Sequence, residues 1–374
     1  MNKVLFIFGT RPEAIKMAPV INAFNADQSN FQTVVAVTAQ HREMLDQVLT
    51  LFDIVPDYDL DLMAPNQTLE SLTSKVLIGI SDLLVEIKPD VVFVQGDTTT
   101  TFASALAAFY KMIPVAHIEA GLRTNNIYSP FPEEINRRMT TSMASYHFPP
   151  TKQSQQNLLN EGVDKGIIKV AGNTVIDALL AVSNKIDKET DNYDNYFSES
   201  YNIHFNHKKT ILVTGHRRES FGGGFENICE AIKKIAEQND VQVIYPVHLN
   251  PKVQEPVNRI LNKIKNVHLI PPQDYVPFIY LMKKAHIILT DSGGVQEEAP
   301  SLGKPVLVLR DTTERPEGVD AGTAKLVGTN AFEIKSSVQL LLDNKDEYNK
   351  MAKAVNPYGD GNASEMIYNY LLNI

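Results

Sequence analysis

Two sets of side chains with opposite chemistry follow the apolar runs of this 374-residue sequence. The first set is cationic, titratable or glycine-rich, and it comprises Arg11, Lys16, His216, Ser292, Gly293, Gly294 and Arg315. The second set is acidic, and it comprises Asp97, Glu119 and Glu133. Cations and free backbone N–H groups hold phosphates, whereas partly desolvated carboxylates move protons. The combination is typical of an enzyme that holds a diphosphate and performs acid–base chemistry on an attached group, such as the sugar of a nucleotide-sugar.

The stretch 290–298 predicts the phosphate site most directly. An apolar run at 285–289 predicts a buried strand, and apolar periodicity resumes after it as a helix. Ser292, Gly293 and Gly294 would therefore lie where a strand meets a helix N-terminus, and the two glycines would let an anion approach the backbone. Glu298 follows about one helical turn later, where a carboxylate can accept hydrogen bonds from a ribose. The alternative is a tight turn in which Ser292 only caps the helix.

The remaining cations follow other predicted strands. Arg11 and Lys16 come after the run 4–8, at the edge where open α/β sheets bind ligands, although both could be solvated surface charges. His216 lies in the loop 215–224, which contains arginines and glycines but lacks the Walker pattern, and Gly9 starts no dinucleotide fingerprint. We interpret His216 as a phosphate ligand that, when protonated, helps a diphosphate leave. A structural histidine is the alternative.

The three acidic residues also follow predicted elements. Asp97 comes after the strand expected at 90–95, although an aspartate there more often caps the next helix. Glu119 comes after an almost fully apolar strand, so we expect a raised pKa for Glu119 that suits proton transfer. Glu133 and Glu134 open a helix whose first position is expected to be Pro132. Complementing the helix dipole is a sufficient role for one of these two glutamates.

The composition excludes several classes of protein. A net charge of −9 argues against a surface that binds nucleic acid or anionic membrane. No apolar run approaches the ~20 residues of a membrane span, and the N-terminus has a strand pattern rather than a signal-peptide pattern. The single cysteine, Cys229, rules out a disulfide within the chain and fits a reducing compartment. We expect a soluble cytoplasmic protein that binds neither nucleic acid nor membrane.

Strand and helix patterns alternate along the chain, which predicts an α/β fold with two doubly wound, Rossmann-like domains. Strands are expected at 4–8, 31–38, 90–95, 114–118, 146–148 and 167–170, and again at 210–214, 242–246, 267–270, 285–289 and 305–309. The polar stretch 187–207 is expected to be an irregular connection. The first domain would comprise residues 1–170 with the C-terminal helical segment 357–374, and the second residues 171–356. The two domains would face a central cleft at the carboxyl edges of their strands.

Six motifs resemble those of the bacterial non-hydrolysing UDP-N-acetylglucosamine 2-epimerases, and they extend over essentially the whole chain. They occupy 8–16, 95–98, 117–123, 130–134, 215–219 and 291–298 and read FGTRPEAIK, QGDT, HIEAGLR, PFPEE, GHRRE and DSGGVQEE. The resemblance implies the GT-B fold and a homodimer. It also implies conversion of UDP-N-acetylglucosamine (UDP-GlcNAc) to UDP-N-acetylmannosamine (UDP-ManNAc) for surface polysaccharide, with no metal and no redox cofactor.

The resemblance further implies a role for each candidate residue. The UDP phosphates and their surroundings would be held by Arg11, Lys16, His216, Ser292, Gly293, Gly294 and Arg315. Gln273 and Phe278 would frame the uracil, and Glu298 would bind the ribose. Asp97, Glu119 and Glu133 would be the acids and bases at the sugar, with His216 as a further catalytic residue. UDP would leave C1 as C2 loses its proton, giving 2-acetamidoglucal, and would then re-add. Which carboxylate acts on each face of C2 stays open.

A second, regulatory UDP-GlcNAc site beside the active site is also implied. Gln40, Gln67 and His248 stand at matching motifs, and Asn66 stands where some members have an arginine. Three rival functions remain: a sugar transferase with an acceptor groove, a hydrolysing epimerase that releases free ManNAc, and a UDP-sugar sensor. The carboxylate set disfavours the sensor, because buried acids are costly to keep without a use.

Overall fold

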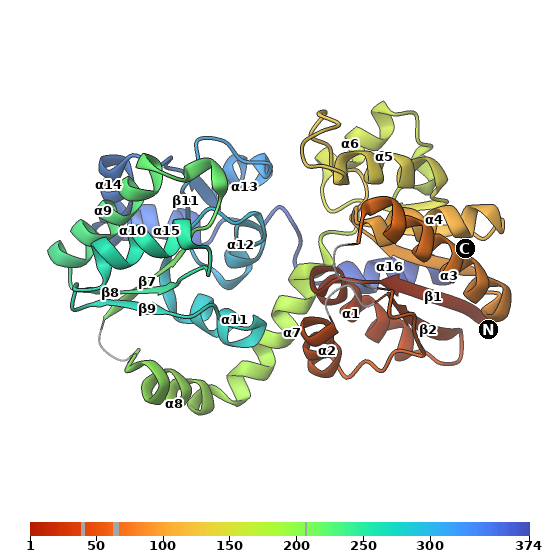
Figure 1. Ribbon diagram of the computed structural model, residues 1–374, viewed down its shortest axis with the longest axis horizontal. Coiled ribbons are helices and arrows are strands. Elements are labelled where there is room, and N and C mark those ends of the chain that lie inside the picture. Colours follow the sequence, from red (N-terminus) through yellow and green to blue (C-terminus); the bar gives the residue numbers. More distant parts are fainter. Residues whose placement is uncertain (39–41, 63–66, 206–207) are drawn as a thin grey trace. The chain divides into compact units, whose positions relative to one another are not determined.

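The computed structural model describes residues 1–38, 42–62, 67–205 and 208–374. They divide into two compact units, Met1–Ala178 with Tyr358–Ile374 and Leu179–Pro357 (Figure 1). The first boundary lies inside a helix, α7 (Thr174–Lys188), whereas the sequence placed it at residue 171. The start of α7 belongs to the first unit because Asp177 accepts hydrogen bonds from the backbone N–H (2.8 Å) and hydroxyl (2.6 Å) of Ser364. The two units are called unit 1 and unit 2 below.

The described part of unit 1 contains a six-stranded parallel sheet of order β3-β2-β1-β4-β5-β6. Its strands are β1 (Asn2–Phe8), β2 (Phe31–Val37), β3 (Tyr58–Asp59), β4 (Val91–Gln95), β5 (Val115–Ile118) and β6 (Tyr146–Phe148). Its helices are α1 (Arg11–Asn25), α2 (Arg42–Leu51), α3 (Leu69–Ile87), α4 (Thr99–Tyr110), α5 (Glu133–Met143), α6 (Lys152–Asn160), the 3₁₀ turn η1 (Lys165–Ile167) and the C-terminal α16 (Ala363–Leu372).

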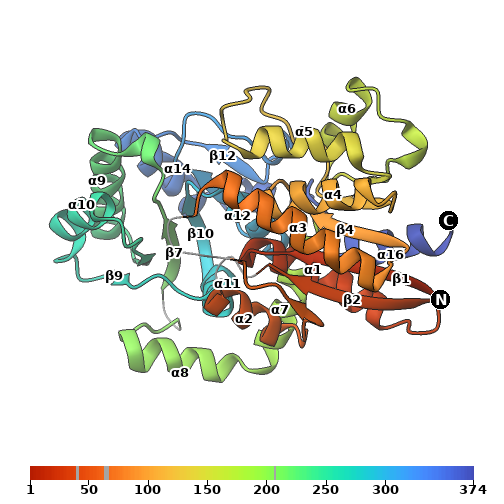
Figure 2. The ribbon, with the colours of Figure 1, turned by 45° about the vertical axis from the view of Figure 1, so that its right-hand side comes forward.

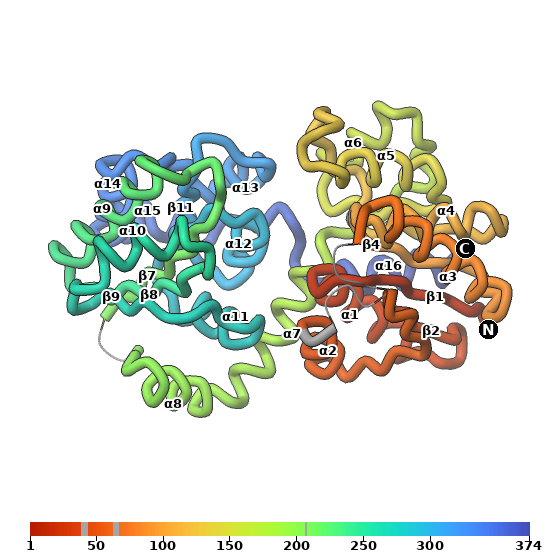
Figure 3. The backbone as a smooth tube through the Cα atoms, viewed as in Figure 1, coloured from red at the N-terminus to blue at the C-terminus, as the bar shows by residue number. Residues whose placement is uncertain are grey.

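Both faces of this sheet are covered by helices. Alternation along β1 directs Leu5 and Ile7 to one face, where they join a buried cluster with side chains of α3 and α4. Phe6 points to the other face and meets Phe24 of α1, with ring centroids 5.5 Å apart. The C-terminal helix α16 lies beside α1, and its Tyr368 ring is 5.4 Å from that of Phe24 (Figure 3). Burial on both sides explains why the strands read as continuous apolar runs.

Unit 2 contains a second six-stranded parallel sheet, of order β12-β11-β10-β7-β8-β9 among the described residues. Its strands are β7 (Lys209–Thr214), β8 (Val241–Pro246), β9 (Val267–Ile270), β10 (Ala285–Thr290), β11 (Val306–Val308) and β12 (Ala324–Leu326). Its helices and 3₁₀ turns are α8 (Thr190–Tyr201), η2 (Arg218–Ser220), α9 (Gly223–Gln238), α10 (Pro251–Leu261), α11 (Tyr275–Lys284), α12 (Gly293–Glu298), η3 (Ala299–Leu302), α13 (Pro316–Asp320), α14 (Ala331–Asp343) and α15 (Lys345–Ala352).

The two sheets have the same strand order. Read from β9, the second sheet places its strands third, second, first, fourth, fifth and sixth in chain order, as the first sheet does when read from β3. The first and fourth strands are therefore neighbours in each unit, and Figure 2 shows β7 and β10 side by side. The prediction of two Rossmann-like units is confirmed. Loops that follow such a pair of strands lie at the topological switch point, where α/β folds bind ligands.

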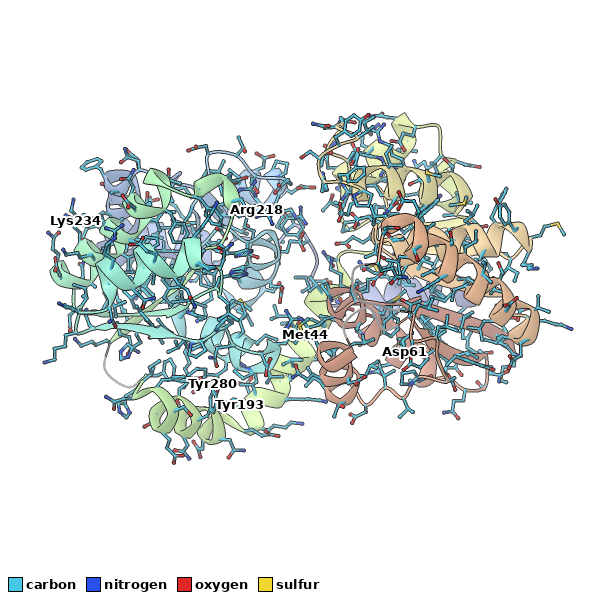
Figure 4. The ribbon with its side chains drawn as sticks, viewed as in Figure 1. Met44, Asp61, Tyr193, Arg218, Lys234 and Tyr280 are labelled. Carbon is cyan, nitrogen blue, oxygen red and sulfur yellow. The ribbon has the colours of Figure 1, made fainter. Side chains whose placement is uncertain are left out.

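Two predictions about individual elements are wrong. Residues 167–170 form no strand, and Ile168 makes only an isolated bridge with His147. The stretch 187–207 contains the helix α8, which was missed because Phe197 is its single buried residue. Aromatic contacts hold α8 against α11: Tyr193 and Phe197 stack on Tyr280 with centroids 5.4 and 5.6 Å apart. Tyr193 and Tyr280 are labelled in Figure 4.

Two further observations concern helices. Pro132 is the N-cap of α5 rather than its first residue, because its ψ of 9° belongs to the turn before the helix. Across the described ranges, no helix combines the length and the apolar character that a membrane span requires.

Candidate active site

A pocket of about 210 Å³ opens at the carboxyl ends of the central strands of unit 2. It is bounded by loops that follow β7, β8, β9 and β10, and its lining includes Gln273 and Phe278, which were predicted to frame a uracil, and His216 and Ser292, which were predicted to hold phosphate. His248, predicted for a regulatory site, lines the same pocket. A small pocket with one aromatic wall and a few polar groups suits a planar ligand such as a nucleobase.

Asp291 holds the His216 loop in place. Its Oδ2 accepts the backbone N–H groups of His216 (2.7 Å) and Arg217 (2.8 Å), and its Oδ1 lies 3.4 Å from Nδ1 of His216. The His216 ring stacks on that of His248, with centroids 5.2 Å apart and planes inclined by 13°. Burial lowers the pKa of His216, and the Asp291 carboxylate raises it in part. The imidazole is therefore neutral for most of the time at pH 7, and it can be protonated when a bound anion adds negative charge.

The Ser-Gly-Gly stretch lies where it was predicted. Ser292 is the N-cap of α12, and Gly293 and Gly294 are its first two residues. A Cβ on Gly293 would lie 3.6 Å from the guanidinium carbon of Arg315, so the Arg315 side chain lies against the glycine. Glu297 holds Arg315 there, with 2.5 Å between Oε1 and Nε. A cation and free N–H groups thus meet at the first turn of α12, as a diphosphate site requires.

Glu298 is the last residue of α12, about one turn after Gly294. A Cβ on Gly294 would lie 3.5 Å from Oε1 of Glu298, so the carboxylate is next to the glycine turn. Burial raises the pKa of Tyr275 well above its usual value, and the negative charge of Glu298 adds to this rise. The predicted ribose ligand is thus beside the predicted phosphate site.

Gln273 is positioned by the helix that the sequence pattern did not reveal. Its Oε1 accepts a hydrogen bond from the Tyr196 hydroxyl (3.2 Å), and its Nε2 donates to the Tyr201 hydroxyl (3.3 Å). Both tyrosines belong to α8. The same Nε2 donates to the Pro271 carbonyl at 2.8 Å. The polar composition of α8, which hid it from the apolar pattern, therefore supplies the hydroxyl groups that orient a pocket residue.

Glu119 is the centre of the acidic set in unit 1. Its Oε1 lies 2.5 Å from Nζ of Lys16 and 3.4 Å from Nδ2 of Asn173, and its Oε2 accepts from Nε2 of Gln95 at 2.5 Å. The Glu119 side chain is 8% exposed and the Lys16 side chain 17% exposed. Lys16 was predicted as a phosphate ligand, and its ammonium is joined here to the predicted acid–base residue. Glu119 also has a φ of +61°, an unfavourable conformation for a non-glycine residue, and such strained residues cluster at active sites.

Asp97 is paired with a residue that sequence reasoning did not select. Both Nε (3.0 Å) and Nη2 of Arg137 donate to Asp97 Oδ2, and Asn136 donates to the Asp97 carbonyl at 3.0 Å. Burial raises the pKa of Asp97, Arg137 opposes the rise, and the charge of Glu119 adds to it. Arg137 and Asn136 lie in the first turns of α5, directly after the PFPEE motif, and the motif itself was the signal that could have indicated them.

Glu133 and Glu134 have different roles in α5. Glu134 is fully buried and accepts the backbone N–H groups of Thr124 (3.0 Å) and Asn125 (3.2 Å), as well as one bond each from Arg137 and Arg138. It therefore takes the structural role that the sequence allowed for one of the two. Glu133 is the first residue of the helix and is half-buried, which leaves its chemical role as a prediction.

Arg11 is the first residue of α1 and is half-buried at the carboxyl end of β1. Its loop is shaped by Glu13, whose Oε2 accepts the N–H groups of Gly9 (3.0 Å) and Thr10 (2.8 Å). Oε1 of Glu13 accepts the hydroxyl of Thr98 at 2.6 Å, which joins the loops after β1 and β4. Thr10 and Glu13 form a capping box, a sequence signal that could have identified this glutamate.

The predicted regulatory residues are placed only in part. Gln40, together with Asn66, lies outside the described residues. Gln67 directly precedes Thr68, which caps α3 in unit 1. His248 lies in the unit 2 pocket against His216, as described above.

The family model for UDP-N-acetylglucosamine 2-epimerase matches residues 23–372. The chain belongs to the UDP-N-acetylglucosamine 2-epimerase family. Among its relatives in this isomerase family, a probable UDP-N-acetylglucosamine 2-epimerase of Ralstonia solanacearum is 60% identical over 98% of both chains. The UDP-N-acetylglucosamine 2-epimerase of Escherichia coli K12 is 59% identical, over 99% of this chain and 98% of the relative. The crystal structure of UDP-GlcNAc 2-epimerase from Neisseria meningitidis bound to UDP-GlcNAc matches with a TM-score of 0.89 and 53% identity, over all of both chains. The family resemblance and the fold predicted from the motifs are thereby confirmed.

Proposed function

We propose that this protein interconverts UDP-GlcNAc and UDP-ManNAc by inverting C2, without hydrolysis and without a cofactor. The observation that carries the proposal is the ion pair of Lys16 and Glu119, whose negative charge also raises the pKa of Asp97. Unit 2 of the same chain has the pocket that we assign to the nucleotide. Membership of the epimerase family supports it, as does the UDP-GlcNAc bound by the Neisseria relative.

The nucleotide would be held by unit 2. Gln273 and Phe278 would contact the uracil in the pocket, and Glu298 would accept hydrogen bonds from the ribose. The first turn of α12 would bind the diphosphate through its N-cap Ser292 and through Arg315, with Arg11 as a further cation. The pocket lining supports the assignments of Gln273, Phe278 and Ser292, and the distances to Gly293 and Gly294 support those of Arg315 and Glu298. The assignment of Arg11 rests on the family motif.

The chemistry would be an elimination followed by an addition. A carboxylate takes the proton from C2, the electron pair of that C–H bond forms the C1–C2 double bond, and the C1–O bond breaks with its electrons on the UDP oxygen. The products of this step are 2-acetamidoglucal and UDP. UDP oxygen then re-attacks C1 as an acid delivers a proton to the other face of C2. Asp97, Glu119 and Glu133 would supply these acids and bases, and the raised pKa of Asp97 suits a proton donor.

The departing diphosphate must be stabilised because the C2 proton is weakly acidic. His216 would supply this stabilisation by donating a hydrogen bond from its ring N–H to a phosphate oxygen of UDP, and this bond strengthens as negative charge develops there. Stabilisation of charge that develops only in the transition state lowers the barrier more than equal binding of substrate and product would.

One experiment separates this reaction from its rivals. UDP-GlcNAc is incubated with the protein in D2O without acceptor or NAD, and the products are followed by NMR. We expect UDP-ManNAc with deuterium at C2. Free ManNAc as the main product would instead indicate a hydrolysing epimerase, and a product without solvent deuterium would exclude proton transfer at C2. Unchanged substrate would favour a transferase or a sensor.

We propose a second, regulatory binding of UDP-GlcNAc that involves Gln40, Gln67 and His248. The stack of His248 on His216 supports the idea, because a ligand that contacts His248 would act on a catalytic group directly. The test compares the dependence of initial rate on UDP-GlcNAc concentration in the wild type and in His248→Ala. We expect a sigmoidal curve that becomes hyperbolic in the variant. A hyperbolic curve for the wild type would contradict the proposal of a regulatory UDP-GlcNAc site.

We also propose a homodimer formed through unit 1. At the end of α4, Phe109, Tyr110 and Met112 are 55%, 63% and 91% exposed, which is unusual for neighbouring large apolar side chains. Sedimentation should give a dimer for the wild type and a monomer for Phe109→Asp with Met112→Asp. The control is Phe332→Asp on α14, where a 72% exposed side chain is changed in the same way. A dimer that survives the paired change would place the interface elsewhere.

The product would supply ManNAc units for a cell-surface polysaccharide, made in the cytoplasm where nucleotide-sugars form. Deletion of the gene should remove ManNAc from that polysaccharide, and fractionation should recover the enzyme with the cytoplasm. The support for this placement is the family alone.

A further inference from the structure

A second pocket of unit 2, of about 440 Å³, lies at the opposite edge of the sheet from the nucleotide pocket. Four lysines line it, Lys208, Lys209, Lys284 and Lys304, and we call it the lysine pocket. Lys209 and Thr214 are the two ends of β7, and Thr214 lines the nucleotide pocket. Because the strands are parallel, the amino ends of β10 and β11 come to the same edge as Lys209. The two pockets therefore occupy the two edges of one sheet.

The charge of the lysine pocket is unusual for this chain. The protein carries a net charge of −9, yet none of the described residues that line the pocket is acidic. Lys208 reaches Asp240 at 2.9 Å and Lys284 reaches Asp194 at 3.3 Å, both of them carboxylates outside the lining. Lys209 donates to the neutral carbonyl of Leu342 at 3.1 Å. For Lys304, the described part of the chain offers no carboxylate partner, so the pocket keeps an excess of positive charge.

Several of its groups are also removed from water. Burial lowers the pKa of Lys304, and the nearby charge of Lys283 lowers it further. Burial lowers the pKa of His286 to about 4, with the charges of Lys209 and Lys304 adding to the effect. Nε2 of His286 is buried and has no hydrogen-bond partner among the described residues. Buried polar atoms of native proteins are nearly always bonded, and an exception calls for a partner such as a water, an ion or a ligand.

The pocket walls are held in place by aromatic contacts. The His286 ring stacks on that of Tyr348, with centroids 4.2 Å apart and planes inclined by 7°. The Lys284 ammonium lies 5.5 Å from the Phe205 ring centroid and 5.2 Å from that of Tyr280. Tyr280 is fixed in turn by α8, because its ring stacks on that of Tyr193, and both residues are labelled in Figure 4. Lysines held in this way lose less conformational freedom when they bind an anion than lysines on an open surface do.

We propose that the lysine pocket is a second ligand site, which binds a small compound carrying a diphosphate or another multiply charged phosphate group. Its volume is in the range of small-molecule sites, and lysine ammonium groups bind phosphate as point charges. His286 Nε2 would donate a hydrogen bond to a phosphate oxygen, and Lys209 and Lys304 would neutralise the negative charge of the phosphate. The site is independent of the epimerase reaction and would stand if that reaction were disproved.

Histidine signals can test the site and distinguish it from the active site. Full-length protein labelled with ¹³C-histidine is titrated with inorganic pyrophosphate, and the ring Cε1 signals are followed by NMR. His286 reports on the lysine pocket and His216 on the nucleotide pocket, and each signal is assigned from its own glutamine variant. We expect a saturable shift of the His286 signal, with weaker binding at high salt because exposed charges are screened. A His286 signal that does not move at millimolar pyrophosphate would overturn the proposal.

Matched lysine variants complete the test. Lys304→Gln and Lys209→Gln should each raise the pyrophosphate concentration for half-saturation of the His286 shift about tenfold, as loss of one charge-assisted contact does. Lys234→Gln removes the same charge from α9 of the same unit and should leave the titration unchanged (Figure 4). Equal half-saturation in all four proteins would overturn the proposal. If Lys304→Gln fails to fold, as judged by circular dichroism, Lys209→Gln carries the comparison.

A third arm identifies the source of the phosphate group. ADP presents the same diphosphate on a nucleoside, and its titration is compared with that of pyrophosphate. Tighter binding of ADP at His286 would identify a nucleoside diphosphate, and tighter binding of pyrophosphate would identify the free anion. Turnover is not measured in these titrations, so a failure of the epimerase proposal and a failure of the lysine-pocket proposal give different results.

Discussion

Nζ of Lys16 lies 2.5 Å from Oε1 of Glu119, and these two residues are separated by 103 positions in the sequence. Both side chains are largely withdrawn from water. A buried ion pair of this kind costs desolvation energy on both partners, and removing one partner leaves the other charge uncompensated. A costly ion pair beside Asp97, whose pKa is raised by burial, is expected of a site that moves protons.

The first prediction separates stability from activity at this pair. Lys16→Met should lower the free energy of unfolding by about 1–3 kcal/mol, because the Glu119 charge loses its cation. The double variant Lys16→Met with Glu119→Gln should recover most of that loss, since no buried charge is left unpaired. In both variants we expect turnover to be ~10²-fold or more below that of the wild type. Urea unfolding and the epimerisation assay measure the two effects. A double variant that recovers activity together with stability would make the pair structural.

Gly96 provides a test of how closely Glu119 is positioned. Gly96 has a φ of +70°, and an added Cβ would lie 3.3 Å from Oε2 of Glu119. Gly96→Ala should therefore destabilise the fold by about 1–2 kcal/mol and also displace the carboxylate. The matched control is Gly162→Ala, where φ is +84° but nothing lies within 4 Å of the added Cβ. Only Gly96→Ala should lose turnover. Equal activity in the two variants would show that turnover does not depend on the exact position of the Glu119 carboxylate beside Gly96.

His216 is predicted to stabilise the departing diphosphate. His216→Ala should reduce turnover ~10²-fold or more while the fold is largely kept, because the Asp291 bonds to the loop are to backbone N–H groups. His204→Ala, which changes an exposed histidine of the same unit, serves as the control. Steady-state kinetics and circular dichroism check both proteins. Near-normal turnover in a folded His216→Ala protein would assign this histidine to structure.

The stability of unit 1 should depend on pH through two buried histidines. Burial lowers the pKa of His117 to about 3 and that of His147 to about 4, whereas an unfolded histidine titrates near 6.5. Between pH 6.5 and about 4 the unfolded chain therefore binds more protons, and the free energy of unfolding falls as the pH is lowered. The slope is at most about 1.4 kcal/mol per pH unit for each histidine.

Urea unfolding at pH 7 and pH 5, followed by circular dichroism, measures this dependence. His147→Gln should lose less stability between the two pH values than the wild type does. His204→Gln, at an exposed position, is the control for the substitution itself. A pH dependence that is the same in His147→Gln and the wild type would contradict the assignment.

Much of the fold could be predicted from the sequence because both faces of each sheet are buried. Strands such as Val91–Gln95 and Ala285–Thr290 therefore stand out as apolar runs. Elements that bury little did not stand out, such as the helix α8, which buries only Phe197, and the strands β3 and β12, which are two and three residues long. The helix α14 is different, because it buries Ile334, Val338 and Leu341 but lies in the stretch 316–356, for which no element was predicted.

The sequence selected candidate site residues, whose roles stay predictions, but it did not select the pairs that they form. Strand ends pointed to Asp97, Glu119, His216 and the Ser-Gly-Gly stretch as candidates, since a ligand-binding edge follows from the α/β pattern. The partners could not be identified in this way. Arg137 reaches Asp97 from 40 positions away, and Lys16 reaches Glu119 from 103, and such contacts depend on packing that a single sequence does not display.

The C-terminal helix has a consequence for how the chain is made. Tyr368 of α16 packs against Phe24 and Phe31 in unit 1, and Ser364 is bound by Asp177. These groups are absent from the nascent polypeptide until the whole of unit 2 has been translated. Domains usually fold in the order in which they leave the ribosome. Here unit 2 has all its residues first, and unit 1 keeps an uncovered aromatic surface until residues 358–374 have been added. A ribosome that stalls just before codon 358, or a stop codon there, would therefore damage the unit of the protein that was begun first.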